Sequence, residues 1–326
     1  MINKHFLSLT VFYLVSTLLY ALSAFAESDE FLRLKRDESG TPISMDTAIA
    51  SYQAKEGSKQ AVGVNVDLIG AVHVGEPEYY ALLNNRFKEY DAVLFELILP
   101  EDLKAPPATE ERASNPVSAV QNAVKELLGL HFQLDDIDYH AKNMVHADLT
   151  AEAFARSMNV RGESLWTLFM RLMIQGLAED QPALDPAEEL KLLFGLIVSG
   201  QSRQYALRRY VALNFQNVKE LADKIEGPSG SAIIADRNNR AMEILAIEIA
   251  KGRKNIAIFY GAAHLPDMQL RLAKQFGLYQ KKIEWIPAWK LLPSSETIAV
   301  DGPVTSIKSE PESPKLNPPD VSHSLP

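Results

Sequence analysis

Apolar and β-branched residues gather in two runs early in the chain, at residues 61–75 and 91–99. Runs of this kind, bounded by polar or turn-forming residues, indicate buried strands. Between them, apolar residues recur at helical spacing across residues 76–90. A strand, a helix and a second strand joined by short connections predict a parallel βαβ unit.

The pattern changes between residues 101 and 229, where amphipathic or apolar helical stretches are separated by proline, glycine and polar breaks. We interpret this part as a large helical insertion. The α/β pattern then returns, with helices expected at 234–250 and 266–277 and strands at 255–265 and 282–289. The sequence therefore predicts an α/β fold with a mostly parallel central sheet, flanking helices and a large helical insertion.

The two ends of the chain differ in composition from this α/β domain, which we place at residues 61–292. Residues 1–26 hold one lysine and a long apolar run ending in a small-x-small pattern, which is typical of a cleaved export signal. The length of the run leaves an uncleaved membrane anchor open. Residues 27–60 read as a polar lead-in, and the Pro/Ser-rich residues 293–326 are expected to be disordered. We therefore expect an exported protein, periplasmic or secreted.

Composition narrows the chemistry. The chain has no cysteine, which excludes disulfides, zinc–thiolate sites and a thiol nucleophile, so any metal site must use His, Asp, Glu or water. The formal net charge is −9, and removal of the signal with its single lysine, Lys4, would leave −10. An acidic surface is a poor match for nucleic acid or for an anionic membrane. We expect no nucleic-acid partner, and membrane contact solely through an uncleaved signal.

Two G-x-x-H motifs each follow a predicted strand, Gly70 with His73 and Gly261 with His264. Open parallel sheets bind ligands at the carboxyl ends of their strands, where such residues meet. A glycine at the strand end permits a turn that directs the following histidine into the crevice. Each histidine could equally be a turn residue satisfied by backbone groups, but their matching contexts favour a shared site.

Glu96 places a carboxylate inside an otherwise apolar strand. A buried carboxylate must be paired, protonated or bound to a metal ion, unless the strand is an edge and the side chain faces water. The second predicted strand would bring Glu96 beside His73. Two imidazoles and a carboxylate suit a divalent Zn, Mn, Fe or Co ion and leave positions for water or substrate.

Three further residues are candidates with simpler alternatives. Arg240 could clamp a substrate carboxylate or stabilise developing negative charge, or it could be a surface partner on a solvated helix. His146 and Asp148 could form a second metal-binding cluster. However, Asp148 followed by Thr150 is also typical of the start of a helix.

Four stretches, "LIGAVHVGEPEYYALLNNRFKEYDAVLFEL", "NMVHADLT", "DRNNRAM" and "IFYGAAHLPD", together resemble the TraB/PrgY/GumN/TIKI family. The resemblance covers about residues 64–289 and implies an α/β architecture shared with erythromycin-esterase-like and ChaN-like proteins. It also implies a metal-dependent hydrolase, because TIKI members look like Mn- or Co-dependent proteases and PrgY/TraB members reduce the activity of peptide pheromones. The family's marks fall on Gly70, His73, Glu96, Arg240, Gly261 and His264.

We therefore expect an exported metal-dependent hydrolase with a peptide or protein substrate. His73 and His264 would bind the metal, and Glu96 would complete the ligand set or act as general base. Arg240 would orient the substrate or stabilise the oxyanion. Two alternatives remain open. One is a non-catalytic ChaN-like binder of haem or a peptide, with His264 or Tyr260 as an axial haem ligand. The other is a metal-free esterase with His73 as general base.

Overall fold

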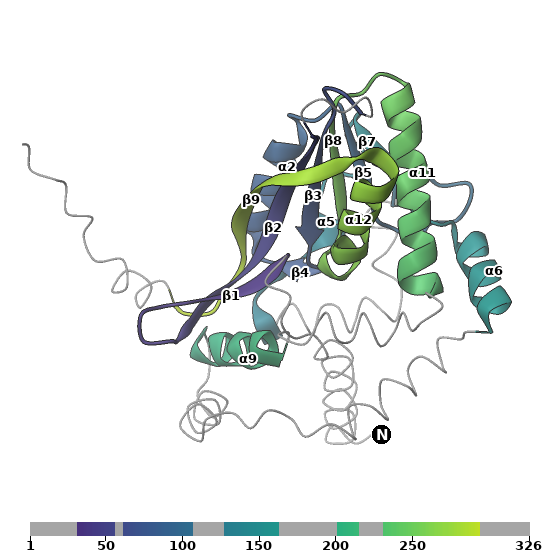
Figure 1. Ribbon diagram of the computed structural model, residues 1–326. Helices are drawn as coiled ribbons and strands as arrows, with labels where there is room; N and C mark the ends of the chain where they lie inside the picture. Colours follow the sequence, from purple (N-terminus) through teal and green to yellow (C-terminus); the bar gives the residue numbers. More distant parts are fainter. Residues whose placement is uncertain (1–30, 56–60, 107–126, 163–200, 215–230, 294–326) are drawn as a thin grey trace, which may run out of the picture. The chain divides into compact units, whose positions relative to one another are not determined.

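The computed structural model of the chain describes five ranges, 31–55, 61–106, 127–162, 201–214 and 231–293 (Figure 1). The predicted export signal and the predicted C-terminal tail from residue 294 onward lie outside these ranges, as do several predicted helices of the insertion. Within the described ranges, no helix combines the length and the apolar character needed to cross a membrane.

The described strands form one seven-stranded sheet and one small two-stranded sheet. The main sheet has the order β1-β2-β3-β8-β5-β7, with β9 also paired to β2, and the small sheet pairs β4 with β6. In chain order the strands are β1 (Leu32–Arg36), β2 (Pro42–Ala54), β3 (Asn65–Ala71), β4 (Val74–Gly75), β5 (Ala92–Phe95), β6 (His131–Phe132), β7 (Met144–His146), β8 (Asn255–Gly261) and β9 (Leu278–Lys290).

Strand direction in the main sheet is nearly uniform. The pairs β3–β8, β8–β5 and β5–β7 are parallel. Strand β2 is antiparallel to β1, β3 and β9, so it is the single strand that runs against the others in the described sheet. The sheet is therefore mixed with mostly parallel strands, which confirms the predicted α/β fold and its mostly parallel sheet.

Helices cover both faces of the sheet (Figure 1). Successive residues of β8 pack into the cores on opposite faces of the sheet, because side chains along a strand point alternately to the two sides. Phe259 packs edge-on against Phe87 of α2, with ring centroids 5.0 Å apart. Ile258 and Tyr260 belong instead to the core cluster that contains Leu245 of α11. The described helices are α2 (Pro77–Phe87), α5 (Gln133–Asp136), α6 (Ala151–Arg161), α9 (Gln201–Asn214), α11 (Arg237–Ala250) and α12 (Leu265–Arg271).

Helix α11 follows a π-helical turn, η2 (Ala232–Asp236), whose N-cap Ser231 accepts a hydrogen bond from the backbone N–H of Ile234. The strand β8 leads through a short 3-10 turn, η3 (Ala262–His264), into α12 and a second π-helical turn, η4 (Leu272–Phe276). These elements agree with the helices predicted from apolar spacing over 234–250 and 266–277.

Residues 27–60, which read as a polar lead-in, supply β1 and β2 of the main sheet. The polar residues that obscured the strand pattern are satisfied inside the fold. Asp46 is buried on β2 and accepts hydrogen bonds from Ser44 at 2.6 Å and from the Nη2 of Arg33 at 3.2 Å. The structured domain therefore begins well before residue 61.

The segment predicted as a helical insertion, residues 101–229, is not purely helical. It contributes β6 and β7, and β7 is a parallel strand of the main sheet beside β5. Its described helices are α5, α6 and α9, and the rest of the predicted helices lie outside the described residues. A large helical insertion is thus not seen in the part of the segment that the structure describes.

Candidate functional site

The carboxyl ends of β3, β5, β7 and β8 lie at one edge of the sheet and carry the candidate residues. The parallel register aligns Gly70 with Tyr260 and Phe95 with Phe259. His73 follows β3, Glu96 follows β5, and His264 ends the turn after β8. Parallel strands place such residues together, which is why ligand sites of open α/β sheets form there.

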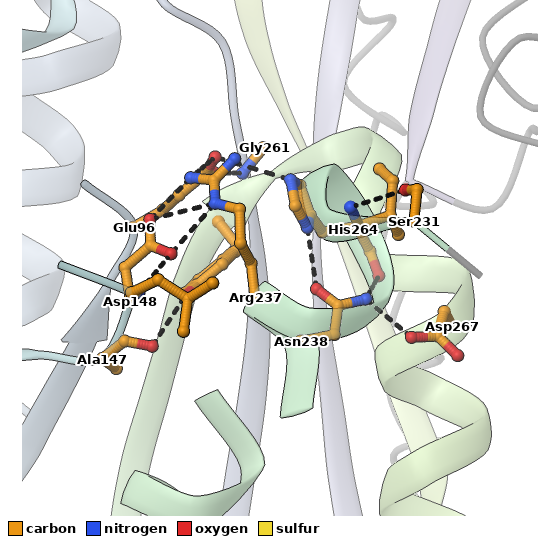
Figure 2. Close-up of polar contacts among 12 residues, drawn as sticks. Glu96, Ala147, Asp148, Ser231, Arg237, Asn238, Gly261, His264 and Asp267 are labelled. Atoms are coloured by element: carbon orange, nitrogen blue, oxygen red, sulfur yellow. Dashed lines mark hydrogen bonds and ion pairs between the residues drawn. The ribbon is translucent and has the colours of Figure 1, made fainter. Parts of the chain in front are cut away.

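Glu96 is the centre of the cluster (Figure 2). Its side chain is 10% exposed. Oε1 accepts a hydrogen bond from Nη2 of Arg237 at 2.6 Å, and Oε2 accepts one from the backbone N–H of Gly261 at 2.5 Å. Nε2 of His264 lies 3.5 Å from Oε1. The carboxylate is therefore fixed on both oxygens by groups from α11 and from the end of β8.

Arg237 connects Glu96 to a second carboxylate, that of Asp148, which follows β7. Its Nε lies 2.9 Å from Oδ1 of Asp148, and its Nη2 lies 2.6 Å from Oδ2. The side chain of Asp148 is fully buried and also accepts a hydrogen bond from the N–H of Leu149 at 2.7 Å. One guanidinium thus pairs with two carboxylates that follow two different strands, and it offsets part of the cost of burying them.

The surroundings shift the pKa of Glu96. Burial raises its pKa, but the guanidinium of Arg237, the imidazoles of His264 and His73 and the N–H of Gly261 outweigh that effect. The pKa falls to about 2, so the carboxylate is ionised across the neutral range. The paired carboxylates in turn raise the pKa of the guanidinium despite its burial.

His264 is buried, and its ring contacts two hydrogen-bonding or charged neighbours. Nδ1 lies 2.7 Å from Oδ1 of Asn238, while Nε2 faces Glu96. Burial lowers the pKa of His264 to about 4, although Glu96 opposes the shift. The imidazole is therefore neutral at pH 7, which is the state in which histidine binds metal ions.

His73 stands at the solvent side of the same cluster. Its side chain is exposed, and its charge would lower the pKa of both Glu96 and His264. Its backbone carbonyl accepts a hydrogen bond from the N–H of Gln133 at 2.9 Å. His73 therefore adds an exposed imidazole within electrostatic reach of Glu96 and His264.

The two motif glycines, Gly70 and Gly261, lie so close to neighbouring atoms that a larger side chain would be crowded there. A Cβ on Gly261 would lie 3.2 Å from Oε2 of Glu96, the oxygen that the Gly261 N–H binds. A Cβ on Gly70 would lie 3.2 Å from the carbonyl oxygen of Phe31 and 3.5 Å from that of Ala48. Gly261 thus permits close approach of the backbone to the carboxylate, and Gly70 permits close packing of β3 against its neighbours.

The structure places Arg240 outside this cluster. Its side chain is 40% exposed, and Nη1 pairs with Glu243 on the same helix at 3.0 Å. The arginine of the cluster is Arg237, one helical turn earlier in α11. The sequence signal that separates them is helical phase, because Arg237 shares the buried face of α11 with Ala241 and Leu245.

His146 and Asp148 both contact residues in or beside the Glu96 cluster. They do not form a second metal-binding cluster in the described part of the chain. Nε2 of His146 donates to the carbonyl of Leu97 at 2.6 Å, next to Glu96, and its ring lies 5.6 Å from that of Phe95. Asp148 binds Arg237 and does not cap α6. The cap of α6 is Thr150, whose hydroxyl accepts from the N–H of Ala153 at 3.2 Å.

Tyr260, the alternative haem ligand, points into the core between β8 and α11. Its hydroxyl donates to the carbonyl of Ala147 at 2.7 Å, and its ring lies edge-on to His264 with centroids 5.3 Å apart. Burial raises the pKa of this phenol well above its usual range. Tyr260 therefore holds the segment that carries Asp148 in place through a buried hydrogen bond to Ala147.

The donors suitable for a metal ion are the imidazoles of His264 and His73 and the carboxylate of Glu96. Across the described ranges, no three His, Asp or Glu side chains are gathered closely enough to hold an ion as they stand. Two of the three, His264 and Glu96, already lie side by side, and the third belongs to an exposed side chain.

Comparisons of the chain with protein-family models, with curated proteins and with solved structures find no match.

Proposed function

We propose that this protein is an exported metal-dependent hydrolase that cleaves a peptide bond in a peptide or protein substrate. The observation that carries the proposal is the 3.5 Å separation between Nε2 of His264 and Oε1 of Glu96. This separation exceeds the about 3.2 Å limit of an ordinary N–H···O hydrogen bond. It is close to the about 3.3 Å that separates two ligands of a tetrahedral ion bound at about 2.0 Å.

His73 would supply the third ligand. Its side chain is exposed, and an ion held by one exposed histidine keeps an open side for water or substrate. The candidate ions are Mn, Co, Zn and Fe, each of which accepts imidazole and carboxylate ligands. The chemistry that a divalent cation supplies at such a site is Lewis acidity, which activates water and polarises a carbonyl group.

Glu96 would act as a metal ligand. A carboxylate whose pKa is lowered to about 2 is a weak proton acceptor, which favours the ligand role over the general-base role. Arg237 is the arginine that contacts Glu96, whereas Arg240, which the sequence suggested for orienting substrate or stabilising the oxyanion, pairs with Glu243. The guanidinium of Arg237 would keep Glu96 ionised and in a fixed orientation, as hydrogen-bonded partners of metal ligands do.

The resemblance of the G-x-x-H motifs and of the "DRNNRAM" stretch to the TraB/PrgY/GumN/TIKI family supports the same activity. The four quoted stretches carry the ends of β3, β5, β7 and β8 and the start of α11, which are the segments of the cluster. A family site composed of those stretches would lie where the cluster lies.

The test is elemental analysis of the protein purified without chelator and reconstituted with each candidate ion. Wild type is expected to bind one ion per chain, whereas the His73→Ala, His264→Ala double variant is expected to bind at least 10-fold less. His140→Ala is the matched control, because His140 is exposed and lies outside the cluster. Hydrolysis of a fluorescent peptide library in the presence of the ion then tests the reaction.

Two outcomes would overturn the proposal. One is the absence of stoichiometric metal in wild type after reconstitution with each of the four ions. The other is metal content equal in wild type and in the double variant, which would place the ion elsewhere.

Metal-free hydrolysis is the second candidate, and one observation favours it. Arg237 already pairs with Glu96 at 2.6 Å, so the buried carboxylate has a cationic partner without an ion. In that case exposed His73 would serve as general base for water, and the substrate would be an ester, as the erythromycin-esterase-like resemblance suggests. Ester hydrolysis that survives exhaustive chelation and is lost in His73→Ala would support this candidate.

A further inference from the structure

Asn238 is the second residue of α11, and it is completely buried between α11 and the start of α12. Its Nδ2 donates to the carbonyl of His264 at 3.1 Å and to Oδ2 of Asp267 at 2.7 Å (Figure 2). A backbone carbonyl and an ionised carboxylate accept hydrogen bonds and cannot donate them. The NH2 group of Asn238 must therefore face these two atoms, which fixes the orientation of the amide.

This orientation decides what Asn238 presents to His264. The remaining amide atom, Oδ1, lies 2.7 Å from Nδ1 of the imidazole. An amide oxygen is an acceptor, so Nδ1 must carry the proton that joins them. In a neutral imidazole the other nitrogen then holds the lone pair. Nε2 of His264 consequently presents a lone pair toward Oε1 of Glu96.

We infer that Asn238, oriented by Asp267, is a positioning residue that holds His264 in the tautomer with its proton on Nδ1. Asp267 is itself anchored, because Nε of Arg271 donates to its Oδ2 at 2.5 Å. Two acceptors, Nε2 and Oε1, then face each other across 3.5 Å, and the space between them suits a cation or a hydrogen-bond donor. The tautomer follows from hydrogen bonding alone, whereas its use in binding an ion rests on the proposed function.

The tautomer can be measured directly by long-range ¹⁵N–¹H NMR on the full chain labelled at histidine, after removal of metal with a chelator at pH 7.5. The signal of His264 is assigned by its loss in His264→Gln. Wild type is expected to show a protonated Nδ1 and an unprotonated Nε2 at this residue. A proton on Nε2 in wild type would overturn the inference.

Three variants separate positioning from packing. Asn238→Ala removes the acceptor, so the proton is expected to move to Nε2 or to divide between the nitrogens. The double variant Asn238→Asp, Asp267→Asn keeps an acceptor toward Nδ1 and a hydrogen-bond donor between the two exchanged side chains, and is expected to keep the proton on Nδ1. Glu243→Ala, at an exposed position on the same helix whose partner Arg240 lies outside the cluster, is the control and should match wild type. An unchanged tautomer in Asn238→Ala would also overturn the inference, and the wild-type spectrum remains decisive if that variant fails to fold.

Metal affinity provides the functional readout. Loss of a residue that orients a metal-bound histidine typically costs 10–100-fold in affinity. We expect a loss of that size in Asn238→Ala and none in Glu243→Ala. A protonated Nδ1 in a wild-type protein that binds no ion would leave the inference standing and remove the proposed function. A wild-type protein that binds the ion but carries the proton on Nε2 of His264 would overturn the inference and leave the proposed function standing.

Discussion

Replacing Arg237 with methionine would remove one cation from two buried carboxylates while keeping most of the side-chain volume. Glu96 would lose its hydrogen bond of 2.6 Å to the guanidinium, and Asp148 would lose those from Nε at 2.9 Å and from Nη2 at 2.6 Å. Each would keep one backbone donor, the N–H of Gly261 for Glu96 and that of Leu149 for Asp148. The variant therefore isolates the contribution of the buried cation.

The expected loss of unfolding free energy follows from this arrangement. Removing one partner of a buried ion pair costs about 3–5 kcal/mol. We expect a loss in that range and not twice as much, because both carboxylates retain an amide donor and can take up a proton. In a domain of this size each kcal/mol lowers Tm by about 2–4 °C, which gives a decrease of roughly 6–20 °C. Arg240→Met is the control and should change stability by at most about 0.5 kcal/mol.

The effect should depend on pH with a defined sign. The folded-state pKa of Glu96 is about 2, below its ordinary value of 4.5. A depressed pKa stabilises the fold fully above the unfolded value, and this stabilisation is lost as pH falls toward the folded value. The difference between wild type and Arg237→Met should therefore be largest near pH 7 and should shrink between pH 4.5 and pH 2.

Urea denaturation followed by circular dichroism measures both quantities. A difference below about 1 kcal/mol at pH 7, or one equal to that of Arg240→Met, would refute the reasoning. A difference that does not change between pH 7 and pH 3 would show that Arg237 acts through packing and not through its charge.

Three further outcomes are expected. Gly261→Ala should lower metal affinity or activity at least 10-fold, since its Cβ would press on the Glu96 carboxylate; unchanged activity would argue against this contact. Tyr260→Phe should lower the free energy of unfolding, measured by urea denaturation, by about 0.5–1.5 kcal/mol and leave metal content unchanged. A loss of metal in this variant would contradict the structural role of Tyr260. His146→Ala should lower stability by about 1–3 kcal/mol at constant metal stoichiometry, and loss of the ion would restore His146 as a ligand.

The strand-end residues could be found from sequence because a general rule of topology applies to them. His73, Glu96 and His264 each follow or end a strand-like run, and parallel strands place such residues at one edge. The histidine tautomer could not be predicted in this way. It depends on Asn238 and Asp267, whose approach to His264 is set by the packing of α11 against α12.

The choice between Arg237 and Arg240 was within reach of the sequence. Arg237, Ala241, Leu245 and Glu248 lie on the buried face of α11, while Arg240 shares the exposed face with Glu243. The apolar positions define this phase without any structure.

The short or polar strands were harder to predict. Strand β7 has three residues, and it can be recognised as a strand through its pairing with β5. Strand β2 contains Asp46, whose burial is explained by Arg33 on the neighbouring strand and by nearby Ser44. Strands β7 and β2 depend on strand pairing and on side-chain hydrogen bonds. The spacing of hydrophobic residues along the sequence does not reveal such contacts.

The antiparallel strand β2 has a consequence for how the chain reaches its fold. It lies near the start of the described domain, yet one of its edges is covered by β9, with Ser44 opposite Lys290. During synthesis that edge, which pairs with β9 from Ser44 to Ala54, would stay uncovered until almost the whole domain has been made. Contacts so distant in sequence form slowly, and an open edge can pair with other chains. Shortened chains that end before β9 are therefore expected to aggregate, and a chaperone that binds extended segments would have its best target at β2.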